Sequence, residues 1–369
     1  MSSTTDQNDR SVRDDQNELR DILLGSAGKL FEDLATPEVI LAAEDGVWPA
    51  ALWAALEETG IPGALVPEDQ GGAGLPFADA LAVLRLAATF AAPVPLAETL
   101  LASAVLGDAG LPVPDGPLSI APVNQTDVLT LLQIGDKWLL SGTATRIPWG
   151  RDVGHLAVVA HATDQKMVAC VPVQGLTPVP GTNLAVEPRD TFVFDNLALP
   201  ADRVAPAPAG SAGDRLYDLG ALLRSAQLAG ALRRVMTVSV EYVNERKQFG
   251  RALGKFQAIQ QQLALLAGEV AAAGAAVDAA VDAAHTQDAR FHIAVAKART
   301  GEAAGFVAET GHQVHGAIGF TREYKLHHST KRLWSWRDEF GTEAEWQDHI
   351  GRQVAAGGAD ALWSMLTGS

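Results

Sequence analysis

The sequence predicts a multi-domain α+β fold with an N-terminal helical domain, a middle β-barrel or β-sandwich domain and a C-terminal four-helix bundle. Three observations support this prediction. Apolar residues recur at helical spacing over residues 17–112, short β-rich runs alternate with Pro and Gly over residues 113–207, and long Ala-rich amphipathic runs occupy residues 208–369. A chain of 369 residues is long enough for two or three domains with a sizeable core.

The N-terminal zone is expected to form several helices joined by short loops. One helical face collects the large aliphatic residues of the first run, namely Leu19, Ile22, Leu23, Leu30 and Leu34. Clusters rich in Gly and Pro separate three further apolar runs, which cover residues 50–59, 76–90 and 96–106. Residues 1–16 are polar and offer no apolar face, so we expect them to form a disordered tail.

The middle zone is expected to form a small β-domain. Its β-rich runs cover residues 127–134, 137–142, 155–162, 167–173 and 190–199. Turn-forming residues separate these runs at the spacing typical of a barrel or sandwich. The single cysteine, Cys170, lies between apolar neighbours on one of the runs, so we interpret it as an inert core residue.

The C-terminal zone is helical again. Amphipathic runs cover residues 222–245, 256–284, 288–312 and 324–336, and a last one begins just after Gly341. The Ala-rich face of the second run permits close approach of another helix, as in a bundle core or a subunit interface.

Composition excludes several classes of function. Lys and Arg number 28 against 44 Asp and Glu, and the resulting net charge of −16 argues against nucleic acid or an anionic membrane as the main partner. One cysteine cannot form an intrachain disulfide, and it fits a reducing cytoplasm, where we expect the protein to be located. The start of the chain lacks an apolar secretion segment, and no uninterrupted apolar stretch approaches ~20 residues, so we expect no membrane span. His327 and His328 are adjacent and do not share a helix face, so we expect no metal site.

Three motifs in the C-terminal zone carry candidate chemistry. ERKQFG (245–250) followed by KFQ (255–257) offers a guanidinium for a pyrophosphate, although a surface arginine beside a turn filled by Phe249 is the favoured explanation when the motif is taken alone. QVHGAIGF (313–320) offers a Gly-containing turn and polar side chains for a nucleotide, or a plain interhelical turn. DEFGTEAEW (338–346) offers a carboxylate beside exposed amides, or a capping box formed by Thr342 and Glu345.

The order of five motifs resembles that of the acyl-CoA dehydrogenase family. PEDQGGAG is followed by a β-domain that closes with VFDNLALPADRV, then by ERKQFG with KFQ, by QVHGAIGFTREY and by FGTE, over roughly residues 17–355. The resemblance implies the same three domains and an FAD flavoprotein, an oxidoreductase of lipid metabolism. In this family a carboxylate removes the α-proton of an acyl-CoA thioester while the β-hydrogen leaves as hydride. Electron-transfer flavoprotein or a similar acceptor then takes the electrons.

The resemblance also assigns residues. The implied FAD contacts are Arg246, Phe249, Phe256, Gln257, Gln313, Val314, His315, Gly316, Ala317, Thr342 and Glu343. Ala317 replaces the second glycine of the family's Gln-x-x-Gly-Gly pattern, and because the family shares this site between subunits, an obligate oligomer is implied. Asp218 matches a substrate-contacting aspartate, and Arg224 lies about one turn beyond the position of an expected arginine, so both are implied to bind substrate.

The chain departs from the family at the catalytic base and at the flavin ring. Phe340 and Gly220 occupy the two positions where relatives carry the base, which leaves Glu339 as the candidate base. Pro148 stands in place of a threonine that lies over the flavin ring, and a proline has no amide donor. In the stretch 119–128, which corresponds to another flavin-binding segment, only Asp127 fits well.

Two functions follow from this pattern. The first is an FAD-dependent acyl-CoA dehydrogenase that introduces an α,β double bond with Glu339 as base. The alternative is a non-catalytic or half-site subunit of an α2β2 heterotetramer whose partner chain supplies the base and the flavin-ring contacts, as in a divergent actinobacterial, sterol-degrading subclass of the family. A redox-neutral member that uses FAD only structurally is a weaker third hypothesis. A homo-oligomer and a heterotetramer both remain compatible with the sequence.

Overall fold

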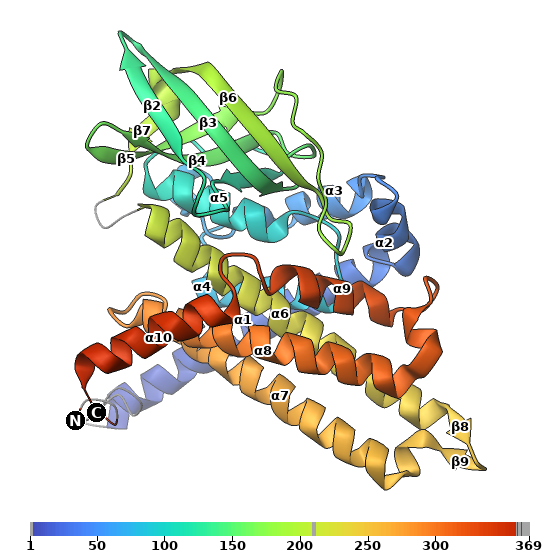
Figure 1. Cartoon of the computed structure of the whole chain (residues 1–369). Coiled ribbons are helices and arrows are strands. Elements are labelled where there is room, and N and C mark those ends of the chain that lie inside the picture. The colour runs from blue at the N-terminus through green and yellow to red at the C-terminus, as the bar shows by residue number, and fades with distance from the viewer. Residues whose placement is uncertain (1–2, 209–211, 359, 361–362, 364–369) are drawn as a thin grey trace.

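The structure is a computed structural model that describes residues 3–208, 212–358, 360 and 363, with only the backbone described for residues 3–16 and 212–214. The fold agrees with the predicted class: N-terminal helices, a central β-sheet and C-terminal helices (Figure 1). The three parts meet around the first half of one long helix, α6 (Ala212–Glu245).

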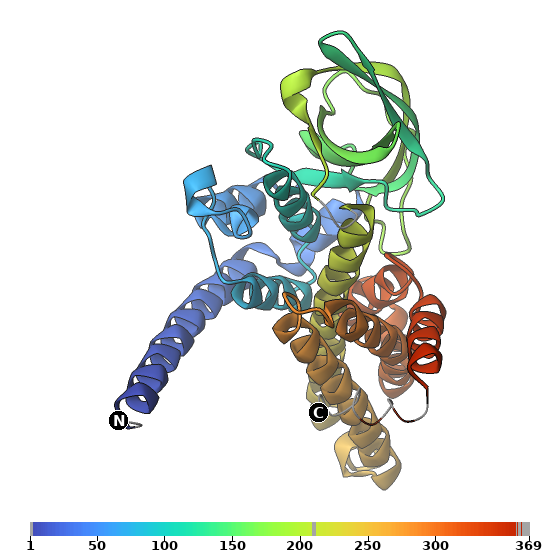
Figure 2. The same cartoon turned by 90° about the vertical axis from the view of Figure 1, so that its left-hand side faces the viewer.

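The N-terminal helices pack around an apolar core. They are α1 (Ser3–Leu34), α2 (Pro37–Glu44), α3 (Ala50–Glu58), α4 (Phe77–Thr89) and α5 (Leu96–Asp108), with short 3-10 turns at Ile61–Gly63 and Glu68–Gln70. The expectation of a disordered tail over residues 1–16 is wrong from Ser3 onward, where the backbone is helical. Once the packed half of α1 has formed its first turns, each further residue adds a hydrogen bond at low entropic cost. Figure 2 shows this end of α1 extending away from the body.

The middle segment forms a curled seven-stranded sheet (Figure 2). Its strands are β1 (Leu118–Ala121), β2 (Leu129–Ile134), β3 (Lys137–Pro148), β4 (His155–Ala162), β5 (Gln165–Pro172), β6 (Arg189–Pro200) and β7 (Val204–Pro206). The strand order is β6-β3-β2-β4-β5-β7, and β1 pairs in parallel with β4. Cys170 is buried, and its sulfur accepts a 3.6 Å contact from a guanidinium nitrogen of Arg203.

The C-terminal segment is a bundle of α6, α7 (Gln257–Asp282) and α8 (Ala289–His315), crossed by α9 (Leu326–Trp336) and α10 (Glu343–Gly357). A small hairpin of β8 (Lys247–Gln248) and β9 (Arg251–Ala252) joins α6 to α7, and η5 (Gly316–Phe320) follows α8. Within the described residues, α7 is long and apolar enough by length and composition to cross a membrane. It packs against α6 and α8, and Leu266, Val270 and Val277 are buried in the bundle, which is also how a core helix behaves.

Candidate functional site

Six buried charged side chains meet where the three parts of the chain touch. All are at most 5% exposed, and they come from α5, the start of β6 and the loop before it, α6, α9 and the loop after α9: Glu98, Glu187, Arg189, Arg224, Arg332 and Glu339. Three carboxylates and three guanidinium groups make the cluster neutral. We call these six residues the charged cluster. Sequence reasoning singled out only Arg224 and Glu339, because the other members lie far away along the chain.

Glu339 occupies the centre of the charged cluster. One carboxylate oxygen accepts a 2.7 Å hydrogen bond from Nε of Arg189, and the other accepts a 2.7 Å hydrogen bond from Nε of Arg224. Burial alone would raise the pKa of Glu339, but the two guanidinium groups outweigh it and hold the pKa at about 2. A carboxylate with this pKa, engaged at both oxygens, is a weak proton acceptor, so the geometry favours a structural role for Glu339 over the expected role as base.

Arg224 donates three hydrogen bonds on the other side of the cluster. Its terminal nitrogens donate to Glu98, at 2.5 Å, and to Gln227, in addition to the bond to Glu339. The guanidinium is 2% exposed and each of its three nitrogens donates a hydrogen bond inside the protein, which disfavours substrate binding by Arg224, although that role stays a prediction. The remaining acid, Glu187, accepts from Arg189 and from the indole of Trp336.

A buried lysine fixes the loop that carries Glu339. The ammonium of Lys297, on α8, donates hydrogen bonds of 2.6 Å to the carbonyl oxygens of Arg337 and Gly341. Burial lowers the pKa of Lys297 to about 7, against the opposing effect of Glu339 and Asp338. Lys297 thus holds the backbone of this loop, while the Glu339 side chain is held by Arg189 of the β-domain and Arg224 of α6.

The two positions at which the family carries its base lie against each other. Phe340 has a positive φ of 55°, which turns its ring toward α6. A Cβ on Gly220 would come within 2.4 Å of that ring, so the phenyl group needs a glycine there. The cavity bounded by Gly220, Arg224 and Phe340 measures only ≈ 10 Å³, about the space of one water molecule. Phe340, Arg224 and Glu98 line this cavity and leave no room in it for an acyl group.

The other predicted residues near this end have ordinary structural partners. Thr342 is the N-cap of α10 and forms a complete capping box with Glu345. Glu343 pairs with Arg337. Asp218 lines a separate hollow of ≈ 1040 Å³ between α5, the start of α6 and the α7–α8 loop, 3.7 Å from Nε of Arg290. Its predicted role in substrate binding stays a prediction.

The rest of the predicted FAD set gathers at the opposite end of α6, around the hairpin (Figure 1). Arg246, Gln257, Gln313, Gly316 and Ala317 are exposed, and the Phe249 ring is 91% exposed. Phe256 is half-buried beneath the guanidinium of Arg251, which lies 4.0 Å from its ring centre. We call Arg246, Phe249, Arg251 and Phe256, which surround this hairpin, the hairpin surface.

Two members of this set face inward. Val314 and His315 are 6% and 4% exposed, His315 stacks on Tyr242 at 4.4 Å, and its Nδ1 lies 2.7 Å from the carbonyl oxygen of Gly311. The side chains of Val314 and His315 pack inside the bundle, so a contact with FAD would have to use the backbone of these residues, and that contact stays a prediction. Neighbouring Gln313 and Ala317 remain available on the surface.

The two groups of predicted FAD residues are far apart in one chain. Between Gly220 and Arg246 the length of α6 is roughly 40 Å at about 1.5 Å per residue. Thr342 therefore cannot contact the same dinucleotide as Arg246 within one subunit.

The residues present fit one half of FAD and do not fit the other half. A guanidinium and exposed backbone next to Gly250, at a φ of 80°, suit a diphosphate at the hairpin surface. In the middle domain, Ile147 is fully buried and Pro148 has no amide donor, and its carbonyl already accepts from the hydroxyl of Ser119 at 2.5 Å. Asp127 is engaged internally by the backbone and hydroxyl of Thr145. At these described positions, Ile147, Pro148 and Asp127 leave no donor or acceptor free for a flavin ring.

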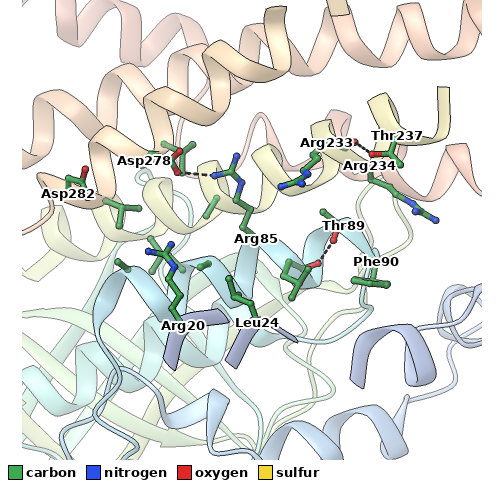
Figure 3. A pocket seen from close by; sticks show the side chains of 17 residues that line it. Arg20, Leu24, Arg85, Thr89, Phe90, Arg233, Arg234, Thr237, Asp278 and Asp282 are labelled. Carbon is green, nitrogen blue, oxygen red and sulfur yellow. Dashed lines mark hydrogen bonds and ion pairs between the residues drawn. The ribbon is translucent and has the colours of Figure 1, made fainter. Parts of the chain in front are cut away.

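A third hollow, of ≈ 790 Å³, lies between α1, α4, α6 and α7 (Figure 3). Arg20, Arg85, Arg233 and Arg234 surround it, and Arg85 points across the hollow to Asp278. Two of the arginines, Arg20 and Arg85, are paired with aspartates. Internal pairing reduces the positive charge available to an anionic ligand, so the hollow does not carry a functional assignment.

Comparison with known proteins agrees with these features. The chain matches the family models for the acyl-CoA dehydrogenase N-terminal domain over residues 14–110 and C-terminal domain over residues 216–354, together more than half of its length. Acyl-CoA dehydrogenase IpdE2 of Mycolicibacterium smegmatis is 29% identical over 321 residues, which are 86% of this chain and 92% of that protein.

Solved structures show the same fold. A structure described as a Tcur3481-Tcur3483 steroid ACAD variant has a TM-score of 0.83 at 28% identity and covers 92% of this chain and 99% of its own. The ChsE4-ChsE5 complex from Mycobacterium tuberculosis has a TM-score of 0.84 at 24% identity, with 91% and 97% covered. With helical domains at both ends matched in sequence and the whole fold matched in space, this chain belongs to the acyl-CoA dehydrogenase family.

Proposed function

We propose that the chain is a non-catalytic, half-site subunit of a heteromeric acyl-CoA dehydrogenase. The observation that carries this proposal is the packing around the two positions expected to hold the base. Phe340 packs on Gly220 beside a cavity of only ≈ 10 Å³, and the Glu339 carboxylate is held by two arginines. Desaturation by this chain alone would require Glu339 to leave both arginines and the acyl group to displace Phe340. That requirement disfavours an autonomous dehydrogenase.

The partner chain supplies the base, the acyl-CoA site and the flavin-ring contacts. This chain supplies the hairpin surface, where Arg246 is exposed and free to bind the diphosphate of an FAD whose ring lies in the partner. An α2β2 assembly follows from one such contact per heterodimer and the twofold symmetry common among oligomers. The similar structure described as Tcur3481-Tcur3483 is named for two chains, which supports this assembly.

The substrate and the electron acceptor belong to the assembly. Its substrate is an acyl-CoA, and the description of that relative as a steroid ACAD supports a steroid-derived acyl group. The chemistry that FAD supplies when it is bound is to accept the hydride from the β-carbon. Electron-transfer flavoprotein or a similar protein takes the electrons onward.

A matched pair of substitutions tests the proposal. Arg246→Gln and Lys247→Gln each remove one exposed cation from the hairpin, and only Arg246 is assigned to the diphosphate. In a complex co-purified with its dehydrogenase-like partner, Arg246→Gln should raise the dissociation constant of FAD at least about tenfold, since a charge-assisted bond contributes about 1.5–3 kcal/mol, and should therefore carry less flavin after dialysis. Lys247→Gln should retain the flavin of the unmodified complex. Equal flavin in all three complexes would contradict the proposed contact.

A further inference from the structure

A cluster of two histidines and one glutamate joins α2 to α9, on the side of the molecule away from α10. Glu44 is the last residue of α2, and His327 and His328 lie in the first turn of α9 (Figure 1). One ligand atom from each residue lies within 4.8 Å of the others. The two imidazole rings are 4.1 Å apart, centre to centre. Adjacency along the helix therefore does not keep the two rings apart, since both lie beside the end of α2, and the expectation of no metal site stays untested.

Each of the three side chains has a buried polar atom that lacks a hydrogen-bond partner in the described part of the chain. These atoms are Oε1 of Glu44, Nε2 of His327 and Nδ1 of His328. His327 and His328 are 7% and 3% exposed, and the side chain of Glu44 is 9% exposed. Buried polar atoms without a hydrogen bond are costly; here Nε2 of His327 has none, and Oε1 of Glu44 and Nδ1 of His328 face each other at 3.5 Å, so a cation among the three would satisfy all of them.

The protonation pattern of His327 suits a metal ligand. Its Nδ1 lies 2.7 Å from the carbonyl oxygen of Tyr324, which requires the proton to sit on Nδ1. The lone pair of Nε2 is then directed into the cluster. A backbone carbonyl on the far ring nitrogen is the usual outer contact of a metal-binding histidine.

Spacing and flanking contacts fit a small divalent cation. Nδ1 of His328 lies 3.5 Å from Oε1 of Glu44, long for a hydrogen bond but close to the separation of two ligands in a tetrahedral site with metal bonds of about 2.0–2.2 Å. The second oxygen of Glu44 is held by Lys331 at 3.3 Å, and Asp45 pairs with Arg322 at 2.8 Å. These two ion pairs fix the end of α2 beside the start of α9 and leave one carboxylate oxygen for the cation.

We propose that Glu44, His327 and His328 bind one divalent transition-metal ion, with Zn²⁺ the best match to two imidazoles and a carboxylate, and with water in the fourth position. The ion ties the N-terminal helices to the C-terminal bundle. The site adjoins the charged cluster through Arg332, which donates a 2.9 Å hydrogen bond to the carbonyl oxygen of His328, but none of its three ligands belongs to that cluster and the site does not depend on the proposed function.

Zn²⁺ and Co²⁺ titrations of the full-length, chelator-treated chain test this site. Co²⁺ should produce the intense visible absorption of a tetrahedral centre, and Zn²⁺ should bind with one ion per chain and abolish that absorption. His328→Ala and Glu44→Gln should each weaken Zn²⁺ binding at least a hundredfold, more than the 10–100-fold typical of changes to outer contacts. His161→Ala removes an exposed histidine from β4 and should leave binding unchanged.

A second pair of measurements separates a metal site from an ion-pair cluster. Lys331→Met removes a positive charge next to Glu44, so it should strengthen Zn²⁺ binding if the site holds a cation. The unmodified protein should also unfold at a higher temperature with Zn²⁺ than without it. Absence of Co²⁺ absorption in the unmodified chain, or Zn²⁺ binding that survives both His328→Ala and Glu44→Gln, would overturn the proposal.

Discussion

Replacing Glu339 by Gln separates a structural carboxylate from a catalytic one. The substitution keeps the size of the side chain but removes the negative charge between Arg189 and Arg224. It also converts one oxygen acceptor into an amide donor, which then faces a guanidinium donor. The buried arginines lose their compensating charge, and one of them loses its hydrogen bond.

The structure sets the size of the effect. Removing one partner from a buried, hydrogen-bonded ion pair costs about 3–5 kcal/mol. At roughly 2.1 cal/mol/K of unfolding entropy per residue, a loss of this size in a 369-residue chain lowers the melting temperature by roughly 4–6 °C. An exposed carboxylate on α8, Glu309, provides the matched control, and Glu309→Gln should stay within about 0.5 kcal/mol of the unmodified protein.

Chemical unfolding of the three proteins at pH 7 measures these differences. Deuterium exchange at the α-carbon of an acyl-CoA, measured on the same samples, reports any base activity. We expect a large loss of stability for Glu339→Gln and no exchange above background in any of the three chains. Unchanged stability together with exchange that only Glu339→Gln abolishes would refute the reasoning and make Glu339 a base.

Three further predictions follow from the same contacts. The pKa of folded Glu339 is about 2, below its usual 4.5, so the stabilisation that its carboxylate provides is complete above pH 4.5 and is lost as the pH falls toward 2. The difference in unfolding free energy between the unmodified chain and Glu339→Gln should therefore shrink over that window. A constant difference would contradict the shift. Gly220→Ala should destabilise the chain by about 1–3 kcal/mol despite its better helix propensity, and Phe340→Leu should relieve most of that cost in a double-mutant cycle by thermal unfolding, whereas strictly additive effects would show that the two residues do not touch. Burial raises the pKa of the Cys170 thiol, so an aromatic disulfide reagent should modify it only after unfolding, and rapid modification of the folded chain would contradict its burial.

Local sequence patterns predict most of the secondary structure. The runs at residues 50–59, 76–90 and 96–106 correspond to α3, α4 and α5 within two residues at each end, because Gly and Pro bound them. The strands β1 and β7 escaped notice because each is short and surrounded by Pro, so neither shows a clear alternating pattern. The helical start of α1 escaped notice because its residues carry no apolar periodicity.

The sites depend on contacts that no local pattern encodes. The sequence indicates Glu339 only because it lies next to the FGTE motif. Its role depends on Arg189 and Arg224, which are 150 and 115 residues away along the chain. Likewise, nothing near His328 indicates that the end of α2 meets the start of α9. The absence of a carboxylate at Phe340 and Gly220 was visible in the sequence, whereas the packing of these two residues against each other required the structure.

The flavin content of the separately purified chain tests the central claim most directly. Visible absorbance and released FAD are measured for the chain expressed alone in the presence of excess FAD, and for the chain co-expressed with its dehydrogenase-like partner. A half-site subunit should be colourless alone and should carry flavin only in the complex. A yellow chain that holds one FAD per subunit by itself and oxidises an acyl-CoA would contradict the account.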